Sequence, residues 1–226
     1  MAGSFTNQPS QHQPLQTIGL FGGTFDPVHI GHLRIALELK QHLGLDQMRL
    51  VPCHIPPHRQ TPVATAAQRE KMVELALAAN TELSLDRVEL DNPEPSYSVH
   101  TLSEIRRSEG DGVSLCLSMG MDSLVNIGTW YRWREILELA HIVVAARPGW
   151  QLPQQGEVAD YFNQHRGEIA DLKNRPAGSI VVQELTLLPI SSTTIRQQIS
   201  DGLSAQFLLP DLVWNYIQQH QLYGIA

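Results

Sequence analysis

The sequence predicts an α/β protein: one domain built on a mainly parallel sheet with crossover helices. A short apolar run, Ile18 to Phe21, is typical of a buried strand, and two glycines end it before a helical apolar period opens at Gly31. A second apolar run, Met48 to Val51, completes the alternation of strand, helix and strand that parallel sheets require. The chain has 226 residues and 42% hydrophobic content, enough for one such core and too little for two large domains.

Further elements follow in order. The helix after the first strand extends from Leu33 to Leu43, carries one polar stripe and ends at Gly44. The periodicity of the rest predicts a series of strands and helices: helix 66–79, strand 83–90, a helix opening within 96–102 with Ser96 or Ser98 as its cap, strand 113–119, a helix from 120–124, strand 141–146, a helical patch over 158–169, strand 179–185, a helix from Ser191 and a closing helix 210–221.

Composition excludes several classes of protein. The net charge of −7 and the isoelectric point near 5.8 argue against a broad nucleic-acid surface. No apolar run approaches the roughly 20 residues of a membrane helix, and no signal peptide is visible, so we expect a cytoplasmic protein. Residues 1–16 are rich in Gln, Pro and Ser and lack a hydrophobic period, which predicts a disordered leader before a domain over 17–226.

The first candidate site is the turn between the opening strand and helix. Gly22 and Gly23 allow a ligand to approach the main chain, and the helix start adds amide donors and a positive dipole end. His29 and His32 lie three positions apart, so both rings can face one pocket. The alternative is that the two histidines only cap or pack the helix. The segment matches neither of the two commonest phosphate-loop patterns.

The second candidate site lies near the other end of the chain. Ser191 and Ser192 are good N-cap residues, and Ile195 opens an apolar stripe, so a helix starts here. Ser192 and Arg196 are four apart, which places a hydroxyl and a guanidinium on one face above the helix N-terminus. A guanidinium offers a planar fork of donors suited to phosphate oxygens. The alternative is an ordinary capped surface helix.

These two segments resemble the signatures of one superfamily. The sequence His29-Ile30-Gly31-His32 resembles the H-x-G-H signature of the nucleotidyltransferases, and it follows that superfamily's G-G-[ST]-F-D-P run. Residues 190–196 match the second signature, I-S-S-T-x-x-R, at every specified position. Three further runs resemble the nicotinate-nucleotide adenylyltransferase branch: 96–102 is similar to S-Y-T-x-x-T-L, 120–124 matches G-x-D-S-L, and 129–133 matches T-W-x-x-W.

The resemblance implies a Rossmann-like, doubly wound sheet and the reaction of ATP with nicotinate mononucleotide to give deamido-NAD and pyrophosphate. Mg²⁺ would be bound through the ATP phosphates, with no metal held by side chains. The resemblance implies three catalytic residues, His32, Arg196 and His29. It implies an ATP-binding set of Gly22, Gly23, Thr24, Phe25, His29, His32, Gly120, Asp122, Ser192, Thr193 and Arg196, and a mononucleotide-binding set of Arg59, Tyr97, Ser98 and Trp130.

The chain departs from the branch pattern at three positions. Arg59 replaces the Lys of P-P-H-K, which keeps the charge and changes the donor geometry. Ser98 replaces Thr, and His100 stands where Asp is common. Within the resemblance, Trp130 stacks on the pyridine ring, whereas Trp133 is structural.

Several alternatives stay open at this point. Asp122 could be a plain N-cap, Trp130 could serve packing alone, and Cys53, His54 and His58 could suggest zinc, although no fourth ligand is suitably spaced. The acceptor could be nicotinamide mononucleotide or a phosphopantetheine. The chain could also be a nucleotide sensor. An aminoacyl-tRNA synthetase is disfavoured because no K-M-S-K-S partner follows.

Overall fold

A computed structural model of the chain describes residues 13–57, 61–151 and 154–225. Its centre is a six-stranded sheet in the order β3-β2-β1-β4-β5-β6, in which every neighbouring pair is parallel. The predicted α/β class and the doubly wound sheet are therefore confirmed. The strands are β1 (Gln16–Gly23), β2 (Gln47–Pro52), β3 (Ser84–Leu85), β4 (Val113–Gly120), β5 (His141–Ala146) and β6 (Ile180–Glu184).

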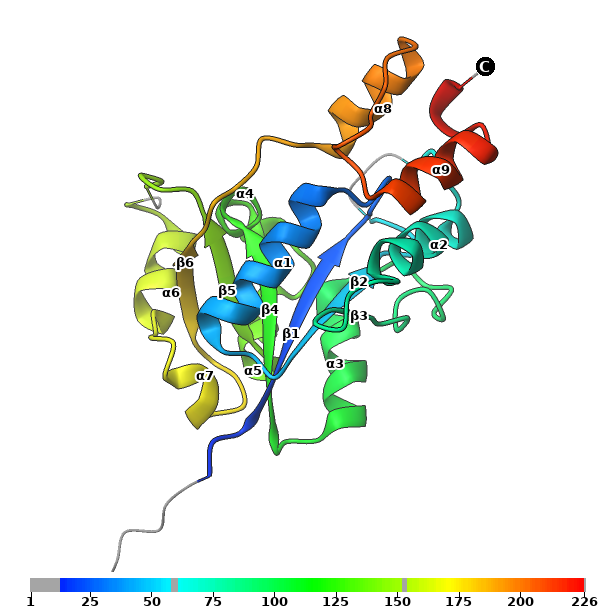
Figure 1. The fold of residues 1–226 in the computed structure, drawn as a ribbon. Helices are drawn as coiled ribbons and strands as arrows, with labels where there is room; N and C mark the ends of the chain where they lie inside the picture. Colours follow the sequence, from blue (N-terminus) through cyan, green and yellow to red (C-terminus); the bar gives the residue numbers. More distant parts are fainter. Residues whose placement is uncertain (1–12, 58–60, 152–153, 226) are drawn as a thin grey trace, which may run out of the picture.

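Helices cover both faces of the sheet, and each face has its own apolar core. On one face, α1 (Ile30–Leu43), α2 (Ala66–Leu77) and α7 (Asp171–Asn174) pack on the sheet, and α8 (Ser192–Ser200) and α9 (Asp211–Gln219) contribute to the same apolar core. Figure 1 shows α1 crossing in front of the strands. The opposite face carries α3 (Ser98–Glu109), α4 (Met121–Val125), the short turns η1 (Ile127–Thr129) and η2 (Trp133–Glu135), α5 (Ile136–Leu139) and α6 (Glu157–His165).

The strand order reverses between β1 and β4, because β1 continues to β2 on one side whereas the chain crosses to β4 on the other. In open parallel sheets a ligand binds in the crevice beyond the carboxyl ends of the strands at such a point. Gly22 and Gly23 end β1 there, and Gly120 ends β4. The fold therefore places the predicted glycine turn at the position where a nucleotide site is expected.

The last part of the chain returns to this crevice. Figure 1 shows α8 and α9 beyond the carboxyl end of β1, beside the start of α1. The backbone N–H of Ile30 donates to the carbonyl of Leu208 at 3.0 Å, and the Ser192 hydroxyl donates to the carbonyl of Pro27 at 2.9 Å. These bonds bring the two sequence signatures, one near each end of the chain, into contact.

Several boundaries differ from the sequence predictions, among them the following. The strand expected over 83–90 is only two residues long, since the Asp86 carboxylate accepts the N–H of Val88 at 3.0 Å and turns the chain. The helical patch ends at His165, and Arg166 then pairs with Ile180 beside the sheet. β1 begins at Gln16, the last residue of the expected leader, and residues 1–12 lie outside the described part.

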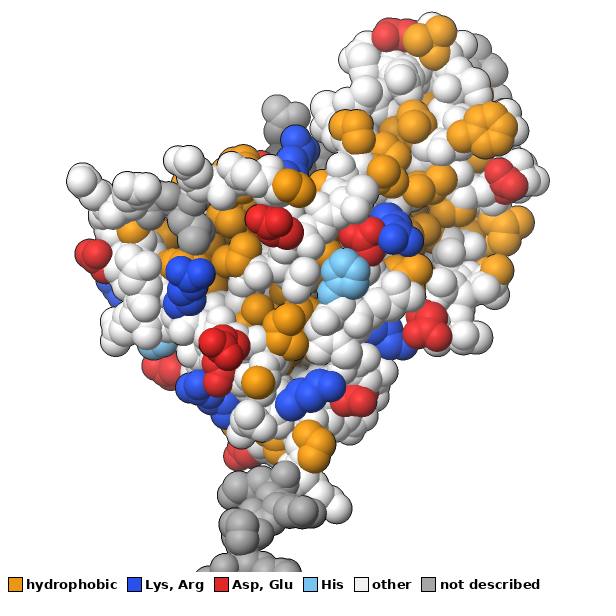
Figure 2. All heavy atoms as spheres, turned by 60° about the vertical axis from the view of Figure 1, so that its left-hand side comes forward, with side chains coloured by type: hydrophobic (Ala, Val, Ile, Leu, Met, Phe, Trp, Pro, Cys, Tyr) orange, Lys and Arg blue, Asp and Glu red, His pale blue; other side chains and the backbone are white. Residues whose placement is uncertain are grey.

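Charged side chains of both signs lie close to one another on the surface (Figure 2). On the face shown in Figure 2, basic and acidic side chains are interspersed and form no continuous basic patch. No helix in residues 13–57, 61–151 or 154–225 combines the length and apolar character needed to cross a membrane.

Candidate active site

The loop after β1 separates two cavities at the switch point. The β4-side cavity, of about 550 Å³, is lined by Tyr97, Ser98, Gly120, Asp122 and Trp130 among others. The α8-side cavity, of about 670 Å³, is lined by residues from both sequence signatures, Phe25, His29, His32, Ser192, Thr193 and Arg196. Both cavities share Phe21, Gly22, Gly23 and Thr24. Ligand groups in the two cavities would therefore meet over the glycine loop.

His29 and His32 cap the start of α1 for each other. The ring Nδ1 of His29 accepts the N–H of His32, and the ring Nδ1 of His32 accepts the N–H of His29, both at 3.3 Å. The two rings stack with their centroids 3.6 Å apart. The capping interpretation is thus correct for both residues. It does not compete with the functional one, because both rings also line the α8-side cavity.

This arrangement fixes the protonation of the two rings. Since each Nδ1 accepts a hydrogen bond, the hydrogen of each neutral ring lies on Nε2. Burial lowers the pKa of His29 to about 4. Burial and, secondarily, the neighbouring His29 lower the pKa of His32 well below its usual value. At neutral pH the pair therefore offers two neutral N–H donors rather than two cations.

The lowered pKa of His29 predicts acid sensitivity of the fold. Between pH 6.5 and about 4 the unfolded chain protonates this residue and the folded chain does not. The free energy of unfolding should therefore fall as the pH falls through this window, by at most about 1.4 kcal/mol per pH unit for one group. Urea denaturation at a series of pH values measures this slope.

A variant separates this effect from that of the carboxylates. His29→Asn keeps a side-chain acceptor at the N-cap and cannot be protonated. Its free energy of unfolding should fall less steeply than that of the wild type between pH 6.5 and 4. Equal slopes for the two proteins would show that His29 does not titrate as described.

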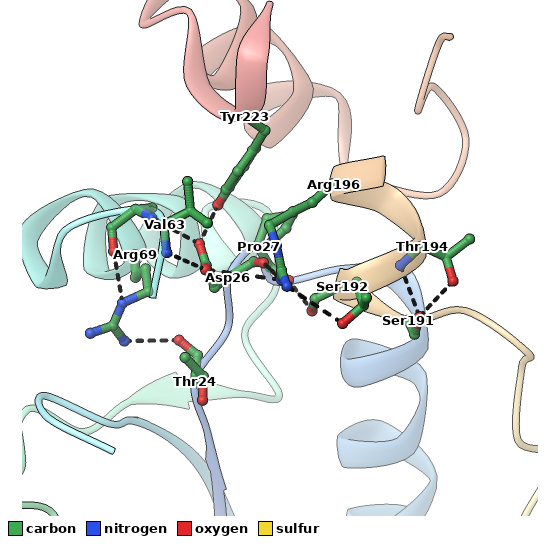
Figure 3. A network of polar contacts seen from close by, with 12 residues as sticks. Thr24, Asp26, Pro27, Val63, Arg69, Ser191, Ser192, Thr194, Arg196 and Tyr223 are labelled. Atoms are coloured by element: carbon green, nitrogen blue, oxygen red, sulfur yellow. Dashed lines mark hydrogen bonds and ion pairs between the residues drawn. The ribbon is translucent and has the colours of Figure 1, made fainter. Parts of the chain in front are cut away.

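The first residues of α8 form the opposite wall of the α8-side cavity. Ser191 caps the helix by accepting the N–H of Thr194 at 3.1 Å, as the sequence predicts. The Arg196 guanidinium donates to the carbonyl of Asp26 at 2.6 Å and lies 3.5 Å from the Thr193 hydroxyl. Figure 3 shows Arg196 and Ser192 reaching from α8 to the loop after β1. His32 and Arg196, far apart in sequence, thus line one cavity.

The start of α3 forms a wall of the β4-side cavity. Tyr97 occupies the N-cap position and Ser98 is the first helical residue, and no described side chain makes a capping hydrogen bond there. The expected cap by Ser96 or Ser98 is therefore wrong, because the Ser96 hydroxyl instead accepts the N–H of His54 at 3.1 Å. Since Ser98 lines the cavity, the N-terminus of a 12-residue helix faces the space that a ligand would fill.

Aromatic side chains line the same cavity. Trp130 is half-buried and packs against the core of the α3 face while also lining the cavity. Trp133 is 6% exposed and stacks edge-on to Tyr161, so its predicted structural role is confirmed. Tyr131, which the motif comparison passed over, lines the cavity beside Tyr97 with ring centroids 4.9 Å apart.

Gly120 and Asp122 also line the β4-side cavity, on the far side of the glycine loop from His32 and Arg196. Gly120 is the N-cap of α4, and Asp122 lies in the first turn rather than at the cap. The interpretation of Asp122 as a plain N-cap is therefore wrong. Asp122 is exposed, which leaves its carboxylate oxygens accessible to a ligand.

Part of the loop after β2 lies outside the described residues. Arg59, predicted to bind the mononucleotide, lies outside the described residues, as does His58 of the zinc alternative. His54 donates from Nδ1 to the carbonyl of Asn92 at 2.8 Å. Among the residues that the structure describes, no group of three His, Cys, Asp or Glu side chains could hold a metal ion.

A buried arginine that sequence reasoning missed links the loops after β1 and β2. Arg69 is 1% exposed and donates to the carbonyls of Thr24 at 2.8 Å, Cys53 at 2.5 Å and His54 at 3.0 Å. Burial lowers its pKa. A buried cation is tolerated when its donors are satisfied, and here backbone carbonyls of the loops after β1 and β2 satisfy them. Arg69 therefore fixes the distance between these loops.

Glu89 is a second residue that the motifs did not reveal. It lines the β4-side cavity and accepts the Thr101 hydroxyl from α3 at 2.7 Å. Burial raises the pKa of its carboxyl. No signal in the sequence marked Glu89, because residues 83–90 were expected to form a strand.

The fold and the site define a nucleotide-binding α/β protein of the nucleotidyltransferase class. The switch point of its parallel sheet carries a glycine loop, two histidines that can donate hydrogen bonds, and the start of a helix that bears an arginine. The cytidylyltransferase-like family model matches residues 20–198, which include both signatures. A protein of Cellvibrio japonicus described as "Probable nicotinate-nucleotide adenylyltransferase" is 54% identical over 207 residues, 92% of this chain and 98% of that protein. A protein of Dechloromonas aromatica with the same description is 47% identical over 92% of this chain and 98% of its own length.

The fold is similar to solved structures as well. A nicotinic acid mononucleotide adenylyltransferase of Plasmodium falciparum, solved in complex with NaAD, superposes with a TM-score of 0.72 at 15% identity, over 93% of this chain and 98% of that one. The chain belongs to the cytidylyltransferase-like family and, within it, to the nicotinate-nucleotide adenylyltransferases. The sequence resemblance is thereby confirmed.

Proposed function

We propose that this protein transfers the adenylyl group of ATP to nicotinate mononucleotide in the biosynthesis of NAD, giving deamido-NAD and pyrophosphate, and that it does so in the cytoplasm. The observation that carries this proposal is the pair of cavities that share the glycine loop. The relatives support the choice of acceptor, since they are described as nicotinate-nucleotide adenylyltransferases.

The reaction is a phosphoryl-type displacement at the α-phosphorus of ATP. An oxygen of the mononucleotide phosphate forms a bond to the α-phosphorus, and the bond from that phosphorus to the α-β bridging oxygen breaks, so that pyrophosphate leaves with its electron pair. The attacking phosphate is already an anion, and no general base is required. Catalysis then consists of alignment and neutralisation of charge.

The α-β-γ phosphates of ATP occupy the α8-side cavity in this proposal. His32 donates from Nε2 to the α-phosphoryl oxygens, where negative charge accumulates, and His29 supports the triphosphate. Arg196 binds the β- and γ-phosphates with its planar fork. The backbone at Gly22, Gly23, Thr24 and Phe25 supplies amides, and Ser192 and Thr193 supply hydroxyls.

The metal enters with the nucleotide. The α8-side cavity presents neutral imidazoles, hydroxyls and a guanidinium, and its lining carboxylate, Asp26, is buried against protein donors. This donor set fits an ion carried by the phosphates rather than by side chains, and we propose Mg²⁺. A Mg²⁺ ion carried in this way would supply neutralisation of the phosphate charge.

Nicotinate mononucleotide occupies the β4-side cavity. The amides at the start of α3, at Ser98, bind the nicotinate carboxylate, and Tyr97 lies beside them. Trp130 stacks on the pyridine ring, and Arg59 binds the phosphate. Gly120 and Asp122 bind the ribose of ATP next to the shared loop, with the Asp122 carboxylate accepting a hydroxyl.

The stacking role of Trp130 makes a quantitative prediction. Trp130→Ala should raise the KM for nicotinate mononucleotide about tenfold, since an aromatic pair contributes up to about 1.5 kcal/mol. The KM for ATP should change less than twofold. Steady-state kinetics with each substrate varied measure both constants. Trp150→Ala, at an exposed position outside both cavities, should leave both unchanged, and a larger effect on ATP than on the mononucleotide would contradict the assignment.

A paired substrate assay tests the proposed function. Purified protein is supplied with ATP and Mg²⁺, and either nicotinate or nicotinamide mononucleotide, and the dinucleotide and pyrophosphate are quantified. We expect deamido-NAD and pyrophosphate in equal amounts, with a higher kcat/KM for the acid than for the amide. A preference for the amide would reassign the acceptor, and no pyrophosphate with either would refute the proposal.

A further inference from the structure

A buried carboxylate lies in the wall of the α8-side cavity. Asp26 follows the glycine loop and is 4% exposed. Its carboxylate accepts the N–H of Val63 at 2.8 Å, the N–H of Ala64 at 3.1 Å and the hydroxyl of Tyr223 at 2.7 Å. Figure 3 shows Val63 and Tyr223 reaching Asp26 from two separate parts of the chain. A buried carboxylate requires such donors, because leaving one oxygen unsatisfied costs its desolvation energy.

The partners of Asp26 are attached to the walls of the cavity. Val63 lines the α8-side cavity itself. Arg196 donates to the backbone carbonyl of Asp26 at 2.6 Å, and its guanidinium nitrogen lies 3.9 Å from the carboxylate. We call Asp26, Val63, Ala64, Arg196 and Tyr223 the Asp26 cluster. It joins the loop after β1, the segment before α2, and α8 to one another.

Tyr223 comes from the last ordered turn of the chain. It lies in η3 (Leu222–Gly224), is buried in the core of the α1 face, and is not among the residues that line either cavity. Its hydroxyl also lies 4.0 Å from the sulfur of Met72. Burial, with Asp26 adding to the effect, raises the pKa of Tyr223, so its hydroxyl keeps its proton and donates to Asp26.

We propose that Tyr223 is a positioning residue for the ATP half of the active site: its hydroxyl holds the Asp26 carboxylate in place and so keeps Arg196 available for the nucleotide. This inference rests on the proposed function for the identity of the ligand. Without the hydroxyl, Oδ1 of Asp26 loses the shorter of its two hydrogen bonds and keeps only the N–H of Ala64 as a donor. Among the described residues, Arg196 forms an ion pair with this carboxylate, 3.9 Å from its other oxygen, and a closer ion pair would turn the guanidinium away from the phosphates.

The test is Tyr223→Phe, which removes one oxygen atom and keeps the ring that packs in the core. We expect the KM for ATP to rise about tenfold, the change that loss of one hydrogen bond to a charged group produces. The KM for nicotinate mononucleotide should stay within twofold of the wild type. A variant weakened only in its fold would show a lower melting temperature with both KM values unchanged, and that result would overturn the proposal.

The matched control is Tyr216→Phe in α9, where the ring packs against His220 with centroids 4.2 Å apart. It removes the same atom from the same region of the chain and should leave the KM for ATP unchanged. Equilibrium titration of wild type and Tyr223→Phe with ATP alone provides a readout that needs no turnover. A dissociation constant for ATP about tenfold higher in Tyr223→Phe than in the wild type supports the proposal whatever the acceptor is, and equal constants overturn it.

Discussion

Replacing His32 by alanine should lower kcat at least about a hundredfold, with a much smaller change in the KM for ATP. The reason is that the Nε2–H of His32 is a preorganised neutral donor where charge develops on the α-phosphoryl oxygens, and removal of one such donor costs about 10²–10³ in rate. The effect belongs to kcat, because the interaction strengthens only as the transition state forms. Steady-state pyrophosphate release measures it.

The capping role of His32 and its proposed catalytic role require separate tests. His32→Ala also removes the acceptor for the N–H of His29, so its stability should be measured beside its activity. His32→Asn places an amide oxygen near the Nδ1 position and has no group at Nε2, so it should keep the cap and lose the activity. His42→Ala, at an exposed position of the same helix, is the control. Near-normal kcat in a folded His32→Asn protein would remove His32 from the mechanism.

Replacing Arg196 by methionine should lower kcat/KM for ATP by roughly a hundredfold to a thousandfold. Methionine keeps the unbranched stem of the side chain as far as the ε position and removes the charge and the planar fork that the β- and γ-phosphates require. Arginines that stabilise transferring phosphoryl groups contribute effects of this size or larger. The measurement is the initial rate at low ATP concentration with saturating nicotinate mononucleotide.

Two further variants make the Arg196 prediction specific. Arg196→Lys keeps a positive charge without the fork, and its kcat/KM should lie between those of the methionine variant and the wild type. Arg107→Ala, which removes an exposed arginine paired with Glu104 on α3, should have no effect. If the lysine variant were no better than the methionine variant, geometry rather than charge would dominate. A wild-type rate for Arg196→Met would contradict the role assigned to it.

The sequence predicted the fold around the first strand because local patterns determine it. The apolar run Ile18 to Phe21, the glycines after it and the period that follows determine β1, its turn and α1 with little help from distant residues. The parallel sheet then brings the two signatures together, since β6 ends at the same edge as β1 and α8 follows it along the chain. His32 and Arg196 therefore line one cavity, as the resemblance implied.

The residues that sequence reasoning missed act through contacts distant in sequence. Arg69 looks like an ordinary polar residue of an amphipathic helix, yet it is buried against carbonyls of two loops. Tyr223 is a single aromatic residue near the end of the chain, and only the tertiary fold brings its hydroxyl to Asp26. The strand expected through Glu89 failed for a local reason, the turn that Asp86 makes.

The central claim is that segments from the two ends of the chain bind one triphosphate. A crystal structure with a non-hydrolysable ATP analogue and nicotinate mononucleotide tests it most directly. It should place Nε2 of His32 about 3 Å from an α-phosphoryl oxygen and the Arg196 guanidinium at the β- and γ-phosphates, with the pyridine ring on Trp130. A triphosphate bound outside the cavity that His32 and Arg196 share would contradict the claim.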